Sequence, residues 1–545
     1  MISTQKLSLS FGGAPLFEDV NIKFLQGNCY GLIGANGAGK STFLKILSGD
    51  IDPTSGILDI EDGKRIAVLK QDQFAYDEVG VLETVLMGHK SLYKVYAERK
   101  ELYEKSEMTD AEGLRVADLE GEFAEMDGYV AESDAATMLS ELGIMEDLQD
   151  KQMGDLEAGQ KIRVLLAQAL FGDPDILLLD EPTNQLDYLT VMWLEKFLMD
   201  FKNLVIVVSH DRHFLNKVCT HIADVDYKKI LVSVGNYDFW QKVTEMSRQQ
   251  KQDQNKKKED KIKDLEEFVR RFSANASKAK QATSRKKLIE KLRPEDLPES
   301  SRRNPYIGFK AQRPCGNSIL EVENLSYTAN GEPILKDVNF VVEKGNKIAF
   351  VGRNTLSRTT LLQILAGEVE PDSGVINWGE SISSSYFPKD NSEYFETKLN
   401  LIEWLSQYTQ SDDEQFIRGF LGRMLFSGDD AKKNVQVLSG GKKARAMFSK
   451  MMLSESNVNM LDEPTDHLDL ESITALNDGL EKFSECLLFT SHDFQLLNTV
   501  ANRVIEVSPL GTLDQKTDFN DFMTSESIRD MRQRLYAEPI SALVK

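Results

Sequence analysis

The chain of 545 residues contains two copies of one plan, and this repeat constrains the fold more than any other feature. Four pairs of segments match in the same order along the chain. They are LSLSFGGAPLFEDV (7–20) with LSYTANGEPILKDV (325–338), GLIGANGAGKSTFLKILSGDIDPTSG (31–56) with AFVGRNTLSRTTLLQILAGEVEPDSG (349–374), LLLDEPTNQLD (177–187) with NMLDEPTDHLD (459–469), and VVSHDRHFL (207–215) with FTSHDFQLL (489–497). The repeat therefore predicts two domains of the same fold within one chain.

The two copies differ by one insertion. The first glycines of the two glycine-rich segments lie 318 positions apart, whereas the aspartates of the two DEPT segments lie 282 positions apart, so the first copy holds 36 extra residues between these points. The extra segment, at about 90–135, is rich in Glu, Lys, Tyr and Ala and is predicted to form a helical arm on the surface.

Each copy alternates short apolar runs with helical patterns, which predicts an α/β fold with parallel strands. Runs such as 176–179 and 204–208 suit strands that are buried on both faces. Apolar residues make up 41% of the chain and the net charge is −22, which disfavours general nucleic-acid binding. The four cysteines lie far apart without a CxxC pair, and no apolar stretch approaches 18 residues, so we expect a soluble, cytoplasmic protein.

The segment between the copies has the opposite charge. Residues 248–293 hold 16 Lys and Arg against 7 Asp and Glu. Apolar residues recur at helical spacing at 262, 265, 268, 269 and 272, and again at 288, 289 and 292, with SANAS (273–277) as a turn between them. The pattern predicts an antiparallel helical hairpin with one helix over 239–272. A charge run of this kind is often only a solvated spacer, but a basic segment in an acidic protein favours a nucleic-acid contact.

The first copy carries the complete phosphate-binding motif G-x4-G-K-[ST] between an apolar strand and a helical pattern. Glycines at these positions let the backbone wrap closely around phosphates, and the helix N-terminus adds partial positive charge. Lys40 is predicted to reach the β- and γ-phosphates of a nucleotide, and Ser41 to bind Mg²⁺. The predicted nucleotide-binding residues of this loop are Gly34, Asn36, Gly37, Ala38, Gly39, Lys40, Ser41 and Thr42.

Three further side chains follow apolar strands of the first copy. Asp180 ends one strand and is predicted to hold Mg²⁺, directly or through water. Glu181 comes next and is the best candidate to polarise the attacking water. His210 follows a second strand and is predicted to orient the γ-phosphate, although a lone histidine there is more often structural.

This arrangement resembles the ATP-binding cassette ATPases over both copies. The resemblance implies that Gln71 is the Q-loop residue, which contacts Mg²⁺ or water, and that Phe11 stacks on adenine. It also implies that LSGGK (438–442) is the signature of the second copy, and that two cassettes face each other head to tail. Site one then combines the first glycine-rich loop with Ser439, Gly440 and Gly441.

Site two departs from the family pattern. Gly37, Gly39 and Lys40 of the first loop are replaced by Thr355, Ser357 and Arg358. We expect the new side chains to intrude where phosphates need close backbone approach. The Q-loop equivalent is Lys389, and the opposing signature LEAGQ (156–160) puts Glu157 where a serine is expected. The remaining predicted residues of this site are Tyr327, which could stack on adenine, and Thr359, Asp462, Glu463 and His492. We expect weak binding and little hydrolysis there.

Two fused cassettes joined by a long charged linker resemble the ABC-F family of translation factors. QDQFA (71–75), VADLEGEFAEMDGY (116–129) and VLLAQALF (164–171) look most like its bacterial YbiT-type subgroup. The resemblance implies a ribosome-associated ATPase whose linker tip approaches rRNA and peptidyl-tRNA, with ATP and Mg²⁺ as ligands and no membrane subunit. The predicted RNA-binding residues are Arg270, Arg271, Lys278, Lys280, Arg285, Lys286 and Lys287.

The expected organisation is a first cassette over 1–237, a linker over 238–300, a second, degenerate cassette over 317–520 and a C-terminal tail over 521–545. We expect a monomer in which the two cassettes of one chain pair with each other. Two other functions stay open at this point: the ATPase subunit of a membrane transporter, and a non-catalytic scaffold that nucleotide locks in one shape.

Overall fold

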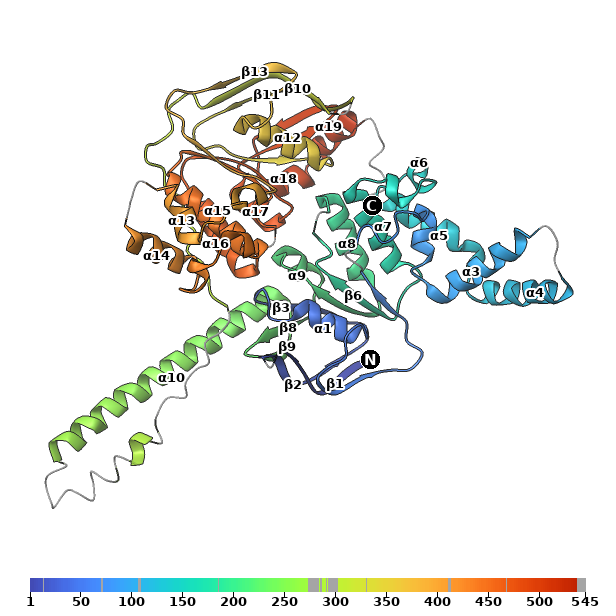
Figure 1. Ribbon diagram of the computed structural model, residues 1–545, viewed down its shortest axis with the longest axis horizontal. Helices are drawn as coiled ribbons and strands as arrows, with labels where there is room; N and C mark the ends of the chain where they lie inside the picture. Colours follow the sequence, from blue (N-terminus) through green and yellow to red (C-terminus); the bar gives the residue numbers. More distant parts are fainter. Residues whose placement is uncertain are drawn as a thin grey trace.

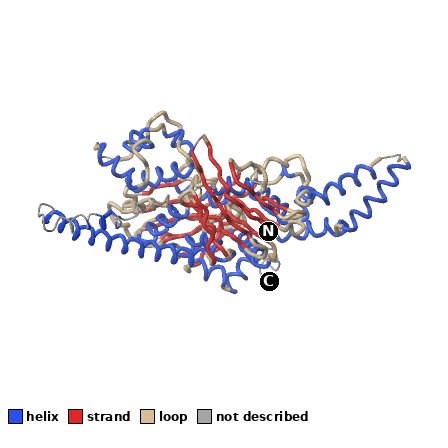
Figure 2. Tube along the Cα trace, turned by 90° about the horizontal axis from the view of Figure 1, so that it is seen from below, coloured by secondary structure: helices blue, strands red, loops and turns tan. Residues whose placement is uncertain are grey.

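The computed structural model describes residues 1–12, 14–69, 72–105, 109–184, 186–272, 284, 287–290, 292, 302–329, 331–409, 413–466 and 468–536. It confirms the α/β fold and the two tandem cassettes, which lie next to each other with one projection at each end of the molecule (Figure 1, Figure 2). Within the part of the chain that the structure describes, no helix combines the length and hydrophobicity needed to cross a bilayer.

Each cassette contains a six-stranded, mainly parallel sheet and a three-stranded antiparallel sheet. In the first cassette the orders are β5-β6-β7-β3-β8-β9 and β2-β1-β4. The strands are β1 (Ile2–Phe11), β2 (Ala14–Phe24), β3 (Cys29–Gly34), β4 (Ser55–Ile60), β5 (Ile66–Val68), β6 (Ile176–Asp180), β7 (Leu204–Val208), β8 (His221–Asp226) and β9 (Lys229–Val234). Strand β7 is buried along its whole length and β6 as far as Asp180, as their continuous apolar sequences predict.

The second cassette repeats this topology strand for strand. Its orders are β14-β15-β16-β12-β17-β18 and β11-β10-β13. The strands are β10 (Leu320–Ala329), β11 (Glu332–Val342), β12 (Lys347–Val351), β13 (Ser373–Trp378), β14 (Ser384–Phe387), β15 (Val458–Asp462), β16 (Cys486–Thr490), β17 (Arg503–Ser508) and β18 (Gly511–Gln515). The sequence repeat is therefore a repeat of the whole fold.

Corresponding helices flank the two sheets. In the first cassette they are α1 (Lys40–Leu47), α2 (Val81–Leu86), α5 (Gly128–Glu141), α7 (Ala158–Leu170), α8 (Tyr188–Asp200) and α9 (Arg212–Val218), and the short α6 (Glu146–Gln149) corresponds to a 3-10 turn, Asp430–Lys432. In the second they are α12 (Thr355–Ala366), α13 (Leu401–Ser406), α14 (Glu414–Arg423), α15 (Gly440–Ser454), α16 (Leu470–Lys482) and α17 (Phe494–Val500). The aspartates at the ends of the two repeated acidic motifs cap α8 and α16. Asp187 accepts from the backbone N–H groups of residues 189 and 190, and Asp469 accepts from that of Ser472.

The predicted arm consists of α3 (Lys90–Tyr103) and α4 (Asp110–Glu125), which project from the first cassette (Figure 1). Arg115 pairs with Glu98 at 2.7 Å and Arg99 pairs with Glu120 at 3.0 Å, and both helices contribute buried apolar side chains to the core of the first cassette. The next helix, α5 (Gly128–Glu141), buries Ala135 and Leu139 in the cassette core, so the projecting part ends before it.

The opposite projection is the linker helix α10 (Tyr237–Phe272), which leaves the first cassette as one unbroken helix (Figure 1). Its 36 residues correspond to about 54 Å at about 1.5 Å per residue. Arg270 is exposed near its end, and Lys287 is exposed in the returning segment. Lys278, Lys280, Arg285 and Lys286 lie outside the described residues, as does the side chain of Arg271.

The C-terminal boundary of the second cassette differs from our prediction. Residues 519–536 are not a tail but two helices, α18 (Phe519–Thr524) and α19 (Glu526–Tyr536). Phe519 and Phe522 are completely buried in the core of the second cassette, and Ile528 of α19 joins them. The sequence signal was present, because these apolar residues recur at helical spacing.

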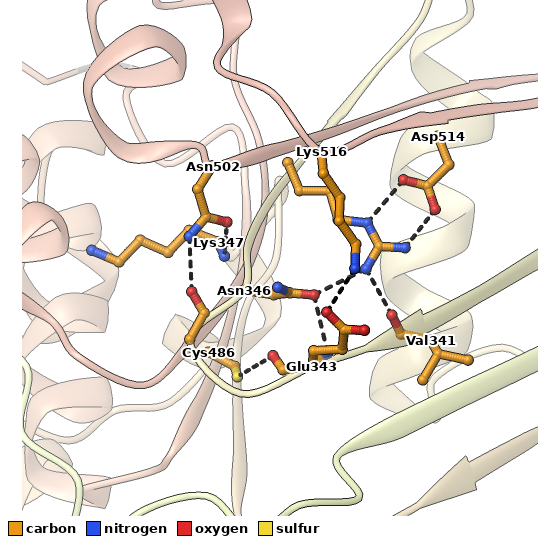
Figure 3. A network of polar contacts seen from close by, with 10 residues as sticks. Val341, Glu343, Asn346, Lys347, Cys486, Asn502, Asp514 and Lys516 are labelled. Atoms are coloured by element: carbon orange, nitrogen blue, oxygen red, sulfur yellow. Dashed lines mark hydrogen bonds and ion pairs between the residues drawn. The ribbon is translucent and has the colours of Figure 1, made fainter.

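A polar network ties the antiparallel layer of the second cassette to its parallel layer (Figure 3). The buried Arg503 donates to the carbonyl of Val341 at 2.7 Å and to Oδ1 of Asn346 at 2.9 Å. Its guanidinium also pairs with the carboxylate of Asp514 on β18. One arginine therefore joins three segments, and a two-pronged contact with a carboxylate fixes its orientation.

At the interface, the first residues of one helix from each cassette are buried in the core of the other cassette. Tyr188 and Leu189 at the start of α8 lie in the core of the second cassette, and Leu470 at the start of α16 lies in the core of the first. His213 of α9 stacks on Phe494 of α17 with a centroid distance of 4.0 Å. The interface therefore consists of buried, interdigitated side chains next to the acidic motifs.

The close approach of β4 to β1 in the antiparallel sheet of the first cassette gives a prediction on stability. Gly56 has φ of 94°, and a Cβ there would lie 2.3 Å from the carbonyl oxygen of Lys6. We expect Gly56→Ala to lower the free energy of unfolding by about 1–2 kcal/mol from its backbone conformation alone, and by a further ~1–3 kcal/mol because β1 must move. Thermal unfolding monitored by circular dichroism measures the change.

Gly63 is the matched control, because it has φ of 76° but no atom within 4 Å of its Cβ position. Gly63→Ala should show only the smaller, conformational loss. Equal losses for the two variants would contradict the close approach at Gly56.

Candidate active sites

The glycine-rich loop of the first cassette joins β3 to α1 in the conformation that phosphate binding needs. Gly37 has φ of 81° and Gly39 has φ of 97°, both in the left-handed region that favours glycine. Lys40 is the first residue of α1, and its Nζ donates to the carbonyl oxygens of Gly34 at 2.9 Å and Ala35 at 3.3 Å. The ammonium group is thus held at the loop, where it would meet phosphate oxygens.

The predicted acidic residues and histidine meet at the carboxyl ends of β6 and β7. The carboxylate of Asp180 hydrogen-bonds the Ser41 side chain. Glu181 follows with φ of 50°, a left-handed conformation that turns its side chain toward His210. Glu181 Oε2 accepts from the backbone N–H of His210 at 3.1 Å, and Oε1 lies 3.3 Å from His210 Nε2.

Burial controls the ionisation of this group. Burial raises the pKa of Glu181 to about 7, although the charge of Lys40 opposes the shift. Burial lowers the pKa of His210 to about 3, with the charges of Lys40 and Arg302 acting in the same direction. His210 is therefore neutral near pH 7, and its contact with Glu181 is a hydrogen bond rather than an ion pair.

A cavity of about 640 Å³ lies between the two cassettes and brings these groups together. The first cassette contributes Lys40, Ser41, Glu181 and His210, and the second contributes Ser439, Gly440 and Gly441 at the N-terminus of α15. Asn36, Gly37, Gly39 and Thr42 also line it. The structure thus places the first loop and the second signature around one space, in the head-to-tail arrangement that the resemblance implies.

These residues fit ATP and Mg²⁺. A Cβ at Gly37 would meet no atom within 4 Å, so the loop is open to the cavity. The hydrogen-bonded oxygens of Ser41 and Asp180 form a hard donor pair of the kind that Mg²⁺ prefers. Lys40 and the N-termini of α1 and α15 supply positive charge for phosphates.

Two predicted residues of site one lie elsewhere or outside the described structure. Phe11 is 55% exposed at the end of β1 and does not line the cavity, so its ring is accessible to stacking but is not part of the cavity wall. Gln71 lies outside the described residues. Gly34 and Ala38 stabilise the loop through backbone atoms. The Gly34 carbonyl accepts from Lys40, and the Ala38 N–H donates to the Ala35 carbonyl.

The second loop differs from the first in its backbone, which our prediction of intruding side chains did not anticipate. Helix α12 begins at Thr355, whereas α1 begins at Lys40, the equivalent of Arg358, so the helix has gained three residues at its start. Asn354 caps it by accepting from the Ser357 N–H at 3.1 Å, and the Ser357 hydroxyl donates to the Ile334 carbonyl at 2.8 Å. The segment that would wrap phosphate is therefore an extra turn of helix.

Arg358 also occupies the chemical centre of the second site. Its Nη1 lies 3.3 Å from Glu463 Oε1, and both side chains are almost completely buried. Glu463 Oε1 lies 3.1 Å from His492 Nε2, and Arg358 Nη2 lies 3.3 Å from the same nitrogen. Burial raises the pKa of Glu463, and the charge of Arg358 opposes this shift. In the first site, by contrast, Lys40 donates to carbonyl groups of its own loop, and Glu181 contacts His210.

The other predicted residues of site two are dispersed. Thr359 and Lys389 line a separate cavity of about 630 Å³. Asp462 accepts from the Thr490 hydroxyl at 2.6 Å inside the core, and Tyr327 packs against the core of the second cassette. Glu157 lies at the N-cap of α7 and is exposed. Neither Glu157 nor Arg358 lines this cavity.

Sequence reasoning missed several residues of the composite cavity. Thr183 and Asn184 of the first cassette and Thr465, Asp466 and Asp493 of the second also line it. Four of them directly follow the proline of a DEPT motif, so the repeat contained the signal but the residues received no role. Asp493 follows His492 in the second SHD segment.

The fold defines a tandem ATPase, and both of its cassettes line this cavity. A family model described as ABC transporter matches residues 17–184 and 335–466, and a second model of the same description matches 223–309. The chain belongs to the ABC-F family of tandem ATP-binding cassette proteins. Such cassettes bind ATP, normally use Mg²⁺ and hydrolyse ATP.

Several curated proteins match over almost the whole chain. "Uncharacterized ABC transporter ATP-binding protein YkpA" of Bacillus subtilis (strain 168) is 57% identical over 99% of this chain and 100% of its own length. "Probable ATP-binding protein YbiT" of Escherichia coli O157:H7 is 46% identical over 97% and 100%. "ABC transporter F family member 5" of Arabidopsis thaliana is 30% identical over 96% and 77%. These relatives agree with the predicted YbiT-type resemblance.

Solved structures show the same fold at low identity. "RNase-L Inhibitor" has a TM-score of 0.59 at 18% identity and covers 98% of this chain and 100% of that one. The archaeal ribosome recycling factor aABCE1, in complex with the ribosomal stalk protein aP1, has a TM-score of 0.58 at 18% identity, over 97% and 98%.

The pKa of Glu181 predicts how activity depends on pH. A water-polarising carboxylate must be ionised, and burial raises its pKa to about 7, so the active form is lost as the pH falls through that value. We expect kcat/KM for ATP to fall about tenfold per pH unit below about pH 7 and to level off above it. Steady-state phosphate release between pH 5.5 and 8.5 measures the profile.

The residual activity of Glu181→Gln corrects this profile for titration of ATP itself. It should lose the additional pH dependence. A profile of the parent protein that matches that of Glu181→Gln would contradict the role of Glu181.

Proposed function

We propose that this protein is a cytoplasmic, ribosome-associated ATPase that hydrolyses ATP to ADP and phosphate mainly at site one. It uses closure of the cassettes to place its linker near tRNA in the ribosome and so modulates translation. One observation carries this proposal: the cavity in which the first glycine-rich loop and Glu181 face the signature of the second cassette. A nucleotide there contacts both cassettes of one chain, so binding and closure are linked.

Each group at site one has a defined task. Lys40 and the loop amides bind the β- and γ-phosphates, and Ser41 and Asp180 hold Mg²⁺, which neutralises charge on the phosphates. Glu181 accepts a proton from the attacking water, and neutral His210 keeps the Glu181 carboxylate oriented. Ser439 and the amides at the start of α15 bind the γ-phosphate from the other cassette. Phe11 stacks on adenine, and Gln71 contacts Mg²⁺ or water.

Site two is weak or inactive in this proposal. Its loop amides are used within α12, and Arg358 is committed to Glu463. To hydrolyse ATP there, the protein must first break a buried ion pair, which leaves charges without compensation. The site keeps Glu463 and His492 in contact but lacks a binding cradle.

The partner is proposed from the linker. Along α10 the side chains of Lys256, Lys257, Lys261, Lys263 and Arg270 are exposed, and they belong to a basic segment of an acidic chain. Positive side chains on a long projection suit recognition of folded RNA through its backbone. The basic residues at 271–287 belong to the same proposed surface, with rRNA and peptidyl-tRNA as its targets. The aABCE1 relatives carry a ribosomal description, which agrees with this direction.

The asymmetry of the two sites predicts unequal effects of one substitution. We expect Glu181→Gln to lower ATP turnover by about 10²–10⁴-fold, because a positioned base contributes about this much. Glu463→Gln should change turnover by less than about threefold, because Arg358 already occupies its carboxylate. Phosphate release at saturating Mg-ATP measures both.

Equal losses from the two substitutions would show that site two turns over despite its helical loop. Thermal unfolding of both variants provides the control. The Glu463 side chain is 1% exposed and pairs with Arg358, whereas that of Glu181 is 15% exposed, so a general loss of folding should affect Glu463→Gln more than Glu181→Gln.

The coupling to the ribosome is tested by sedimentation. Glu181→Gln keeps the groups that bind ATP but cannot activate water, so it should remain closed and co-sediment with bacterial ribosomes in ATP more than in ADP. A ligand shifts a conformational equilibrium only through different affinities for the two states, and only ATP has the γ-phosphate that the second signature contacts.

Adding Lys40→Ala to Glu181→Gln should abolish the difference between ATP and ADP, because phosphate binding is lost. Equal sedimentation of Glu181→Gln in both nucleotides would reject the ribosomal part of the proposal. Ribosome binding that depends on ATP without measurable turnover by the parent protein would instead indicate a non-catalytic scaffold.

A further inference from the structure

One arginine joins the linker to both cassettes. Arg302 lies where the chain returns from the linker, and its side chain is only 13% exposed. Its Nη2 pairs with Asp224 of β8 in the first cassette at 2.5 Å, and its Nη1 pairs with Glu471 of α16 in the second at 3.1 Å. The guanidinium also lies over the ring of Trp240, 4.6 Å from the ring centre. We call Asp224, Trp240, Arg302 and Glu471 the Arg302 clasp.

The Arg302 clasp lies where the two ends of the linker meet the first cassette. Trp240 stands in the first turns of α10, and both it and Tyr237 are packed in the core of the first cassette. The outgoing helix is therefore rooted there. Arg302 brings the returning end of the chain back to the same point, so both ends of the linker are held together over the first cassette.

The chain beyond Arg302 belongs to the second cassette. The Tyr306 N–H donates to the Arg423 carbonyl at 2.9 Å, and Ile307 and Phe309 lie in the core of the second cassette. The backbone that follows Arg302 is thus anchored in the second cassette, while the Arg302 side chain contacts Asp224 and Trp240 of the first. If the cassettes move apart, the Asp224 pair, the Glu471 pair or the short segment 303–305 must change.

A second, equivalent clasp supports the importance of this arrangement. Glu506 and Phe522 stand 282 positions after Asp224 and Trp240, and Arg532 of α19 contacts both. The distance from Arg532 to the ring centre of Phe522 is also 4.6 Å. Across the interface, Arg532 meets the ring of Tyr188 at 5.6 Å, whereas Arg302 meets a carboxylate. Only the clasp at the linker therefore has an ion pair between the cassettes.

The Arg302 clasp lies within electrostatic range of site one. The charge of Glu471 acts on the pKa of Lys40, and the charge of Arg302 acts on that of His210. Glu471 is also the second residue of α16, and the preceding residue, Leu470, is buried in the first cassette. Closure over site one therefore brings together the same surfaces that the clasp connects.

We propose that Arg302 is a positioning residue that couples closure of the cassettes over site one to the base of the linker. This inference rests on the proposed function for its ATP-driven closure. Its ion pair to Glu471 forms only while the cassettes are apposed, and it favours the arrangement that binds ATP. The same contact fixes the returning end of the linker relative to α10, so the linker follows the state of site one.

The test is a double-mutant cycle on ATP hydrolysis by the full-length protein without ribosomes. Arg302→Gln and Glu471→Gln should each raise KM for Mg-ATP about tenfold and leave kcat within about threefold, because closure becomes less favourable while the reacting groups stay in place. The double variant should be no worse than Arg302→Gln alone, since residues that act through one contact are not additive. Arg303→Gln removes the same charge from the neighbouring, exposed position and should leave KM unchanged.

A purely structural role of Arg302 would lower the melting temperature without changing KM, and would overturn the proposal. Additive effects of the two substitutions would also overturn it. If Arg302→Gln fails to fold, Glu471→Gln decides the question alone, because it keeps the contacts of Arg302 with Asp224 and Trp240. KM within twofold of the parent would then reject the clasp.

The linker half of the proposal is tested in the Glu181→Gln background. Adding Arg302→Gln should lower the ratio of ribosome affinity in ATP to that in ADP at least threefold, at ATP concentrations that saturate the variant. An unchanged ratio would overturn this half. If the Glu181→Gln protein itself shows a ratio of one, the ribosomal part of the proposed function fails, and the KM measurements still decide whether the clasp controls closure.

Discussion

The burial of one helix N-terminus from each cassette in the core of the other is the constraint on which the rest of the structure depends. Tyr188 lies in the core of the second cassette and Leu470 in the core of the first. Both residues follow directly on the acidic motifs that end β6 and β15. The positions of Asp180 and Glu181 are therefore tied to the opposite cassette through the six residues that separate Glu181 from Tyr188. A cavity shared by the first loop and the second signature is a consequence of this packing.

Backbone conformation separates the two sites more than side-chain chemistry does. Gly37 and Gly39 hold φ values that residues with a Cβ rarely adopt. With Thr355 and Ser357 at these positions, the chain takes the helical conformation instead, and its N–H groups are satisfied by Asn354 and by the helix. Glu463 and His492 remain in contact beside this helical loop, although Arg358 now pairs with Glu463 and Asp462 accepts from the Thr490 hydroxyl.

Much of the fold could be predicted from the sequence because its signals are local. The repeat, the buried strands, the helix at 239–272 and the complete motif from Gly34 to Ser41 each depend on residues close together in the chain. The pairing of Arg358 with Glu463 could not be predicted, because it joins residues 105 positions apart and depends on where an extra helical turn ends. The packing of α18 and α19 was missed for a related reason. The sequence of a short amphipathic segment does not indicate which hydrophobic core it packs against.

The distribution of buried charge explains why nucleotide should act through site one. At site two, Arg358 already compensates Glu463, so the buried pair needs no ligand. At site one, Lys40 donates to neutral carbonyl groups while Asp180 and Glu181 are half-buried nearby, and burial raises the pKa of both carboxyl groups. Bound Mg²⁺ would compensate the two carboxylates and Lys40 would compensate the phosphates, so we expect nucleotide to stabilise this site more than the other. The Arg302 clasp repeats the distinction, since the ion pair between the cassettes stands beside site one and its counterpart beside site two contacts an aromatic ring. In the function that we propose, both asymmetries place the response to ATP on the side of the molecule from which the linker extends.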